Sequence, residues 1–175
     1  MKDRNSGNVL QDSDLVDVSL NLLQEPSTDE TTKNQILSNL KTKSGWFIKL
    51  DSKVGEKCLS SPVVYYKTAY FTTFSPSQGS ITDPCFIGEG SAVLYAVKYD
   101  TGEAVFNLDL TNDVGGTVVK KSDRSLQIGT AIPSGVVITV IGGKVTAYVG
   151  VGGGLYRPGL SSTRSLFPLT WKLVF

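Results

Sequence analysis

The sequence predicts a mainly β fold of antiparallel meander sheets, with one short helix near the N-terminus. Runs rich in Val, Tyr, Phe and Thr follow one another through the middle of the chain, and these residue types are typical of strands. Turn signals separate consecutive runs, as expected when each strand pairs with the next one along the chain. The chain also contains 18 glycines, which suits a protein with many turns.

The first residues predict a loose lead-in followed by a strand. Residues 1–13 are polar and are expected to be flexible, so we place a single β-rich domain over residues 14–175. A chain of 175 residues is long enough for one domain with a core of its own. Apolar and polar residues alternate along Asp14–Leu23, which favours a strand, although a helical start would fit the same residues.

One helix is expected over about residues 28–42. Ser27 and Glu30 have the spacing of a capping box, in which each side chain satisfies a free backbone N–H of the first turn. Gly45 stands where the helix would end. Three apolar residues lie between these signals at helical spacing: Ile36, Leu37 and Leu40.

Strand-like runs account for most of the remaining chain. The expected strands are Trp46–Leu50, Ser61–Tyr66, Thr68–Phe74, Ala92–Tyr99, Glu103–Asn107, Ser125–Thr130, Gly135–Ile141, Lys144–Val151 and Leu169–Phe175. Asp100-Thr101-Gly102 and Gly142-Gly143 predict two hairpin turns. Leu108–Asp123 and Leu155–Arg164 are expected to form loops.

Several of these stretches carry a family resemblance. They are Gly45–Leu50, Gly55–Val64, Ala69–Ser77, Asp83–Cys85, Leu94–Asn107 and Ile132–Gly143. Together they resemble the C-terminal part of the PilY family, propeller proteins associated with type IV pilus assembly and tip adhesion. The resemblance covers about residues 14–175 and implies a quinoprotein-like β-propeller. At about 40–50 residues for each four-stranded blade, this chain would hold two to three blades.

The resemblance implies a non-enzymatic structural and adhesion module that acts through protein–protein contacts. Its expected partners are the rest of a propeller, minor pilins or another copy of the chain. It also implies an extracellular or cell-surface (fimbrial) location, although the first 20 residues show no signal peptide. The chain would then be a piece of a longer exported protein rather than a cytoplasmic one. No stretch reaches the length of a membrane span.

Two cysteines, Cys58 and Cys85, could form a disulfide, bind a metal or stay reduced. Two cysteines in a chain without histidine make a poor zinc site. The export that the resemblance implies favours the disulfide over free thiols.

Aromatic residues mark the candidate interaction surface. Tyr and Phe residues fall on both faces of Ser61–Tyr66 and Thr68–Phe74, so one face is expected to be core and the other could meet a partner. In the terminal strand, alternate residues share one face. The candidate surface consists of Tyr65, Tyr70, Trp171, Leu173 and Phe175.

Composition argues against several functional classes. The lack of histidine removes the commonest general base and the commonest nitrogen ligand of metals. A net charge of +1 gives no electrostatic reason to expect nucleic acid or an anionic membrane as partner. Gly150–Gly154 follows an expected strand but precedes no helix, so it does not match a dinucleotide site. Lys120, Lys121 and Arg124 form a basic cluster that fits a solvated loop better than an anion site.

We therefore expect no catalytic residue, no metal site and no cofactor. Pyrroloquinoline quinone would need a closed ring of blades, which a chain of this length cannot form. The alternative functions are a carbohydrate- or protein-binding β-domain unrelated to pili and, less favoured, a fragment of a quinoprotein-type enzyme.

Overall fold

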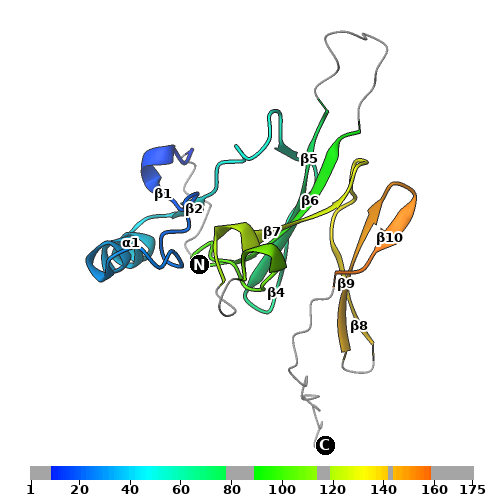
Figure 1. The fold of residues 1–175 in the computed structure, drawn as a ribbon. Helices are drawn as coiled ribbons and strands as arrows, with labels where there is room; N and C mark the ends of the chain where they lie inside the picture. Colours follow the sequence, from blue (N-terminus) through cyan, green and yellow to red (C-terminus); the bar gives the residue numbers. More distant parts are fainter. Residues whose placement is uncertain (1–8, 78–88, 114–118, 142–143, 159–175) are drawn as a thin grey trace, which may run out of the picture.

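The computed structural model describes residues 9–77, 89–113, 119–141 and 144–158, and within them the protein is mainly β with antiparallel sheets and one α-helix (Figure 1). The strands are β1 (Leu15–Asp17), β2 (Gly45–Phe47), β3 (Lys57–Cys58), β4 (Val63–Tyr65), β5 (Thr68–Ser75), β6 (Ser91–Lys98), β7 (Ser125–Gly129), β8 (Val137–Ile141), β9 (Lys144–Val151) and β10 (Gly154–Tyr156). The helices are α1 (Glu30–Thr42) and three short 3₁₀ turns: η1 (Asp12–Asp14), η2 (Leu110–Asn112) and η3 (Lys121–Arg124).

A five-stranded antiparallel sheet forms the centre of the fold. β3 and β4 lie one after the other along the same edge of β5, β5 pairs with β6, and β6 pairs with β7. The β5–β6 pairing is the longest and runs in register from Thr68 opposite Lys98 to Ser75 opposite Ser91. The expected strands over Ser61–Tyr66, Thr68–Phe74, Ala92–Tyr99 and Ser125–Thr130 are thus confirmed, with small shifts of their ends.

The central strand β6 is buried on both faces from Ser91 to Val97. One face of β6 packs against a second antiparallel sheet, in which β9 lies between β8 and β10. The buried residues of this core are Tyr70, Ala92, Leu94, Ala96, Ile128, Val136, Ala147 and Val149. Small alanines on β6 and β9 face larger neighbours, which lets the two sheets approach closely.

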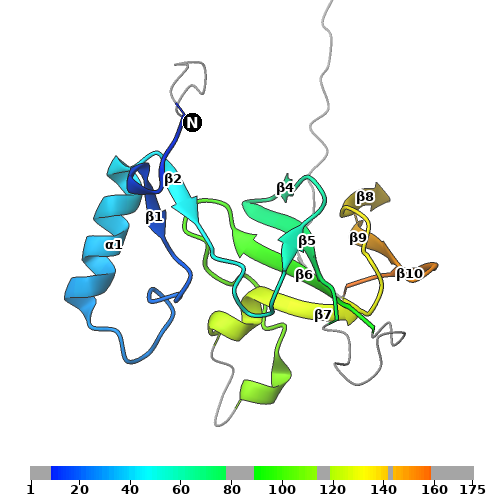
Figure 2. The same cartoon turned by 90° about the horizontal axis from the view of Figure 1, so that it is seen from above.

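The N-terminal residues form a separate layer on the other side of the central sheet, with β1 parallel to β2 and α1 against β1 (Figure 2). Gly102 marks a close approach of this layer to the turn after β6. A Cβ atom there would lie 2.8 Å from Val18 and 3.2 Å from Trp46, and the φ of Gly102 is +69°. The Trp46 indole N–H also donates to the Tyr99 carbonyl oxygen at 3.0 Å, so this layer is tied to the end of β6.

The helix is confirmed, but its first turn is capped differently from the prediction. Asp29, rather than Ser27, is the N-cap, and its carboxylate accepts from the Thr32 backbone N–H at 2.8 Å. An ionised carboxylate at this position satisfies the free N–H groups and also interacts favourably with the helix dipole. The capping box at Ser27 and Glu30 was therefore a wrong prediction.

Three expected strands are shorter than predicted. The strand over Trp46–Leu50 corresponds to β2, which ends at Phe47. The strand over Asp14–Leu23 ends at Asp17, because the Asp17 carboxylate accepts from the Ser19 N–H and the chain then turns through Asn21 at a φ of +55°. The returning strand Glu103–Asn107 is reduced to one bridge between Ala104 and Val97. The turn itself forms, with the Gly102 N–H donating to the Lys98 carbonyl oxygen at 2.9 Å.

The loop predicted over Leu155–Arg164 contains a strand. Gly152 and Gly153 have φ values of +58° and +76°, which form a tight hairpin turn, and β10 returns along β9 from Gly154 to Tyr156. The predicted strand Leu169–Phe175 and the glycine pair Gly142-Gly143 lie outside the described residues.

Leu94→Ala is expected to lower the free energy of unfolding by about 2–5 kcal/mol, because Leu94 is fully buried between the two sheets and its loss leaves a cavity. Urea denaturation monitored by tryptophan fluorescence measures this change. Leu110→Ala is the matched control, since the Leu110 side chain is 72% exposed. Equal effects of the two substitutions would contradict this description of the core.

Candidate functional site

The predicted interaction surface is only partly accessible. Tyr70 is 5% exposed and lies in the core, where its ring stacks on Phe106 with the centroids 6.5 Å apart. Tyr70 was therefore a wrong prediction for a partner surface, because it occupies the face of β5 that meets the second sheet. Tyr65 is half-buried and packs against the same core. Trp171, Leu173 and Phe175 lie outside the described residues.

Cys58 is exposed at the end of β3. Its Sγ lies 3.2 Å from the Ser60 carbonyl oxygen, close enough for a weak S–H donation. Cys85 lies outside the described residues, so the disulfide between Cys58 and Cys85 stays a prediction.

An exposed apolar patch, formed by Val64, Tyr66 and Tyr99, lies where the β4–β5 hairpin meets the end of β6. These side chains are 61%, 56% and 50% exposed. The Tyr99 N–H donates to the Lys67 carbonyl oxygen at 3.1 Å, which places Tyr99 beside the hairpin turn. We name these three residues the hairpin patch. Val64 lies on the outer strand β4 of the central sheet, where an apolar side chain is available to a partner.

The turn inside the hairpin patch has an unusual backbone. Tyr66 and Lys67 have φ values of +46° and +63°, as in a type I′ turn, although neither residue is Gly, Asn or Asp. The left-handed conformation costs an ordinary residue about 1–2 kcal/mol. Such strain persists where the surrounding structure imposes it, and here it holds the Tyr66 side chain at an exposed hairpin tip.

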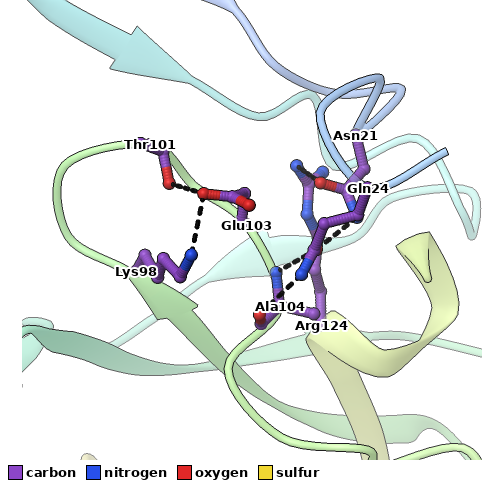
Figure 3. Close-up of polar contacts among 7 residues, drawn as sticks. All are labelled: Asn21, Gln24, Lys98, Thr101, Glu103, Ala104 and Arg124. Carbon is purple, nitrogen blue, oxygen red and sulfur yellow. Dashed lines mark hydrogen bonds and ion pairs between the residues drawn. The ribbon is translucent and has the colours of Figure 1, made fainter. Parts of the chain in front are cut away.

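A buried polar network joins the N-terminal layer to the central sheet (Figure 3). The Gln24 side-chain amide donates to the Ala104 carbonyl oxygen at 3.0 Å, and its oxygen accepts from the Ala104 N–H at 2.7 Å. Gln24 thus satisfies both backbone groups of Ala104, as a neighbouring strand would. The Asn21 amide donates to the same Gln24 oxygen at 2.8 Å. Ala104 therefore has β6 on one side, through its bridge with Val97, and the Gln24 amide on the other.

Arg124 completes this network from η3. Its guanidinium donates to the Ser19 carbonyl oxygen at 3.2 Å and to the Asn21 side-chain oxygen at 3.0 Å. The residue is 3% exposed. Burial lowers the pKa of Arg124 to about 10, and the negative charge of Glu103 acts in the opposite direction. For this residue, the predicted solvated loop was wrong.

Asp123 is also fully buried, and it fixes the loop that carries η3. Its carboxylate accepts from the Asp109 N–H at 2.9 Å and from the Lys120 N–H at 2.6 Å. Because both carboxylate oxygens bind backbone groups, Asp123 holds its own loop and does not point its charge at Arg124.

A second buried carboxylate lies on the same side of the central sheet. Glu56 accepts from the Thr73 hydroxyl at 2.7 Å and from the Tyr95 hydroxyl at 3.0 Å, while its other oxygen has no partner among the described residues. Burial raises the pKa of the Tyr95 hydroxyl well above its ordinary value, and Glu56 adds to this shift. The Tyr95 ring stacks on Phe71 at 4.8 Å. This arrangement anchors the segment before β3 and does not activate a nucleophile.

The described residues contain no group of three or more Cys, Asp or Glu that could hold a metal ion. In the same part of the chain, no helix is both long enough and apolar enough to span a membrane.

Sequence reasoning missed Gln24, Asn21 and Glu56, since polar residues in turns and connectors carry no signal of burial. For Arg124, its position directly before the strand Ser125–Gly129 was the available signal.

Gln24→Ala is expected to lower the free energy of unfolding by about 1–3 kcal/mol, because it leaves two backbone groups of a buried residue without partners. Urea denaturation provides the measurement. Gln35→Ala on the exposed side of α1 is the matched control and is expected to change stability little. A loss no larger than that of the control would mean that water replaces the Gln24 amide without penalty.

No protein-family model matches the chain, and neither a curated protein nor a solved structure matches it. The resemblance to the PilY family therefore rests on the sequence motifs alone.

Proposed function

We propose that this protein is a non-enzymatic structural and adhesion module, resembling the C-terminal propeller segment of type IV pilus-associated PilY proteins. In this proposal it acts at the cell surface in pilus assembly and attachment, through protein–protein contacts. Its partners are the rest of a propeller, a minor pilin or another copy of the chain.

The sheet topology supports this proposal. β4, β5, β6 and β7 lie side by side in the order in which they occur along the chain, and every pairing between them is antiparallel. A propeller blade has the same up-and-down arrangement of four strands. β8, β9 and β10 form a second meander of three strands. These arrangements are compatible with blades, and they also occur in other β proteins.

The observation that carries the proposal is the open outer edge of the central sheet beside exposed apolar side chains. Among the described residues, β4 pairs only with β5, and Val64 of β4 is largely exposed. An open edge offers unpaired N–H and C=O groups to another strand. A propeller removes such edges by closing its ring of blades. A chain with this edge fits a protein whose sheet is completed by another polypeptide.

The 175-residue chain is expected to associate in solution, and Val64→Lys is expected to weaken that association, because a charge on an edge strand opposes pairing. Size-exclusion chromatography with light scattering measures the mass. Leu110→Lys places the same charge at another exposed apolar residue and is the control. A stable wild-type monomer with a cooperative melt would contradict the proposal that another polypeptide completes the sheet.

Cells that carry the gene are expected to lose surface pili and attachment when it is deleted. Reintroduced Val64→Lys is expected to restore them poorly, whereas Leu110→Lys restores them well. Electron microscopy of piliation and a surface-attachment assay provide the readouts. Unchanged piliation and attachment after deletion would contradict the proposed role in pili, whatever the oligomeric state of the purified chain.

A further inference from the structure

A hollow of about 410 Å³ lies between the segment after β2 and the loop that carries η3. Its charged lining residues are Lys49, Lys120, Lys121, Arg124, Glu25 and Asp51. Four cationic side chains thus face two carboxylates, so the hollow has an excess of positive charge. Lys49 is already paired with Asp17, with Nζ and Oδ2 2.9 Å apart.

Arg124 is the buried member of this lining. Its two terminal nitrogens donate to Ser19 and Asn21, but its Nε–H has no partner among the described residues. None of the ion pairs formed within the described part of the chain includes Arg124. Burial of this cation is costly, because it removes the hydration of the charge, and the attraction of Glu103, which also pairs with Lys98, opposes only part of that effect.

Two carboxylates near Arg124, those of Glu103 and Asp123, are committed to other groups. Glu103 lies 3.0 Å from the Lys98 ammonium and accepts from the Thr101 hydroxyl at 2.6 Å, as Figure 3 shows. Asp123 accepts from two backbone N–H groups. Within the part of the chain that the structure describes, the buried guanidinium therefore lacks a dedicated counter-charge, although it lines a hollow open to solvent.

We propose that this hollow is a binding site for a compact oxyanion, with Arg124 at its inner wall and Lys120 and Lys121 near its mouth. The ligand class is a carboxylate or a phosphate, because a guanidinium matches the oxygens of both groups. Two sources present this chemistry, a free inorganic anion and the carboxylate of an acidic sugar. The site does not depend on the function proposed above.

Isothermal titration of the full chain at constant ionic strength tests the site, with inorganic phosphate and D-glucuronate as probes and D-glucose as the neutral control. The expected result is saturable binding of at least one anion and none of glucose. The Arg124 Nε–H resonance in a ¹⁵N–¹H spectrum is expected to move along the same binding curve. Binding of phosphate alone identifies an inorganic anion, and binding of glucuronate identifies a sugar carboxylate.

The double variant Lys120→Gln, Lys121→Gln is expected to weaken anion binding about tenfold, since each substitution removes a positive charge near the mouth of the hollow. This pair is preferred to a substitution of Arg124, which also anchors Ser19 and Asn21. Lys41→Gln with Lys57→Gln makes the same change in net charge at exposed positions outside the hollow and is expected to leave binding unchanged. Three results overturn the proposal: no saturable binding, equal weakening in both double variants, or binding that leaves the Arg124 resonance unmoved.

Discussion

The burial of β6 on both faces is the constraint on which the rest of the structure depends. Seven consecutive residues of β6, Ser91–Val97, are buried. A strand that is apolar on both faces must be covered by other elements on both sides of its sheet. The β8–β10 sheet supplies one cover with small and branched side chains. The N-terminal layer lies over the other side, so residues far apart in the sequence must meet across β6.

The two covers are held by different forces. The β8–β10 side is an apolar core, whereas α1 in the N-terminal layer has no buried residue. That layer is attached instead by directional contacts, among them those of Gln24, Trp46 and Arg124. Hydrogen bonds add less stability than apolar burial of similar extent, but they fix one relative position, because a shifted layer would leave buried donors and acceptors without partners.

The sequence predicted the parts of the fold that local signals determine. The runs around β5, β6 and β7 and the turn at Gly102 were predicted from residue type and spacing, whereas the hairpin at Gly152-Gly153 was not. The Tyr66-Lys67 turn lacks the usual turn residues, yet the strands on either side revealed the hairpin. Contacts such as Gln24 with Ala104 join residues 80 positions apart, and no local pattern encodes them. For the same reason the burial of Arg124 escaped prediction, although its charge was noted.

The long reach of the polar network also has a consequence for biosynthesis. Asn21 is made 103 residues before Arg124, its partner across the layer boundary. At about 5–20 residues per second, roughly 5–20 s separate the two during translation. The β4–β5 hairpin closes over a few residues and can form as soon as it leaves the ribosome, whereas the N-terminal layer must wait for η3. The N-terminal layer is therefore synthesised before the central sheet but reaches its final place after it.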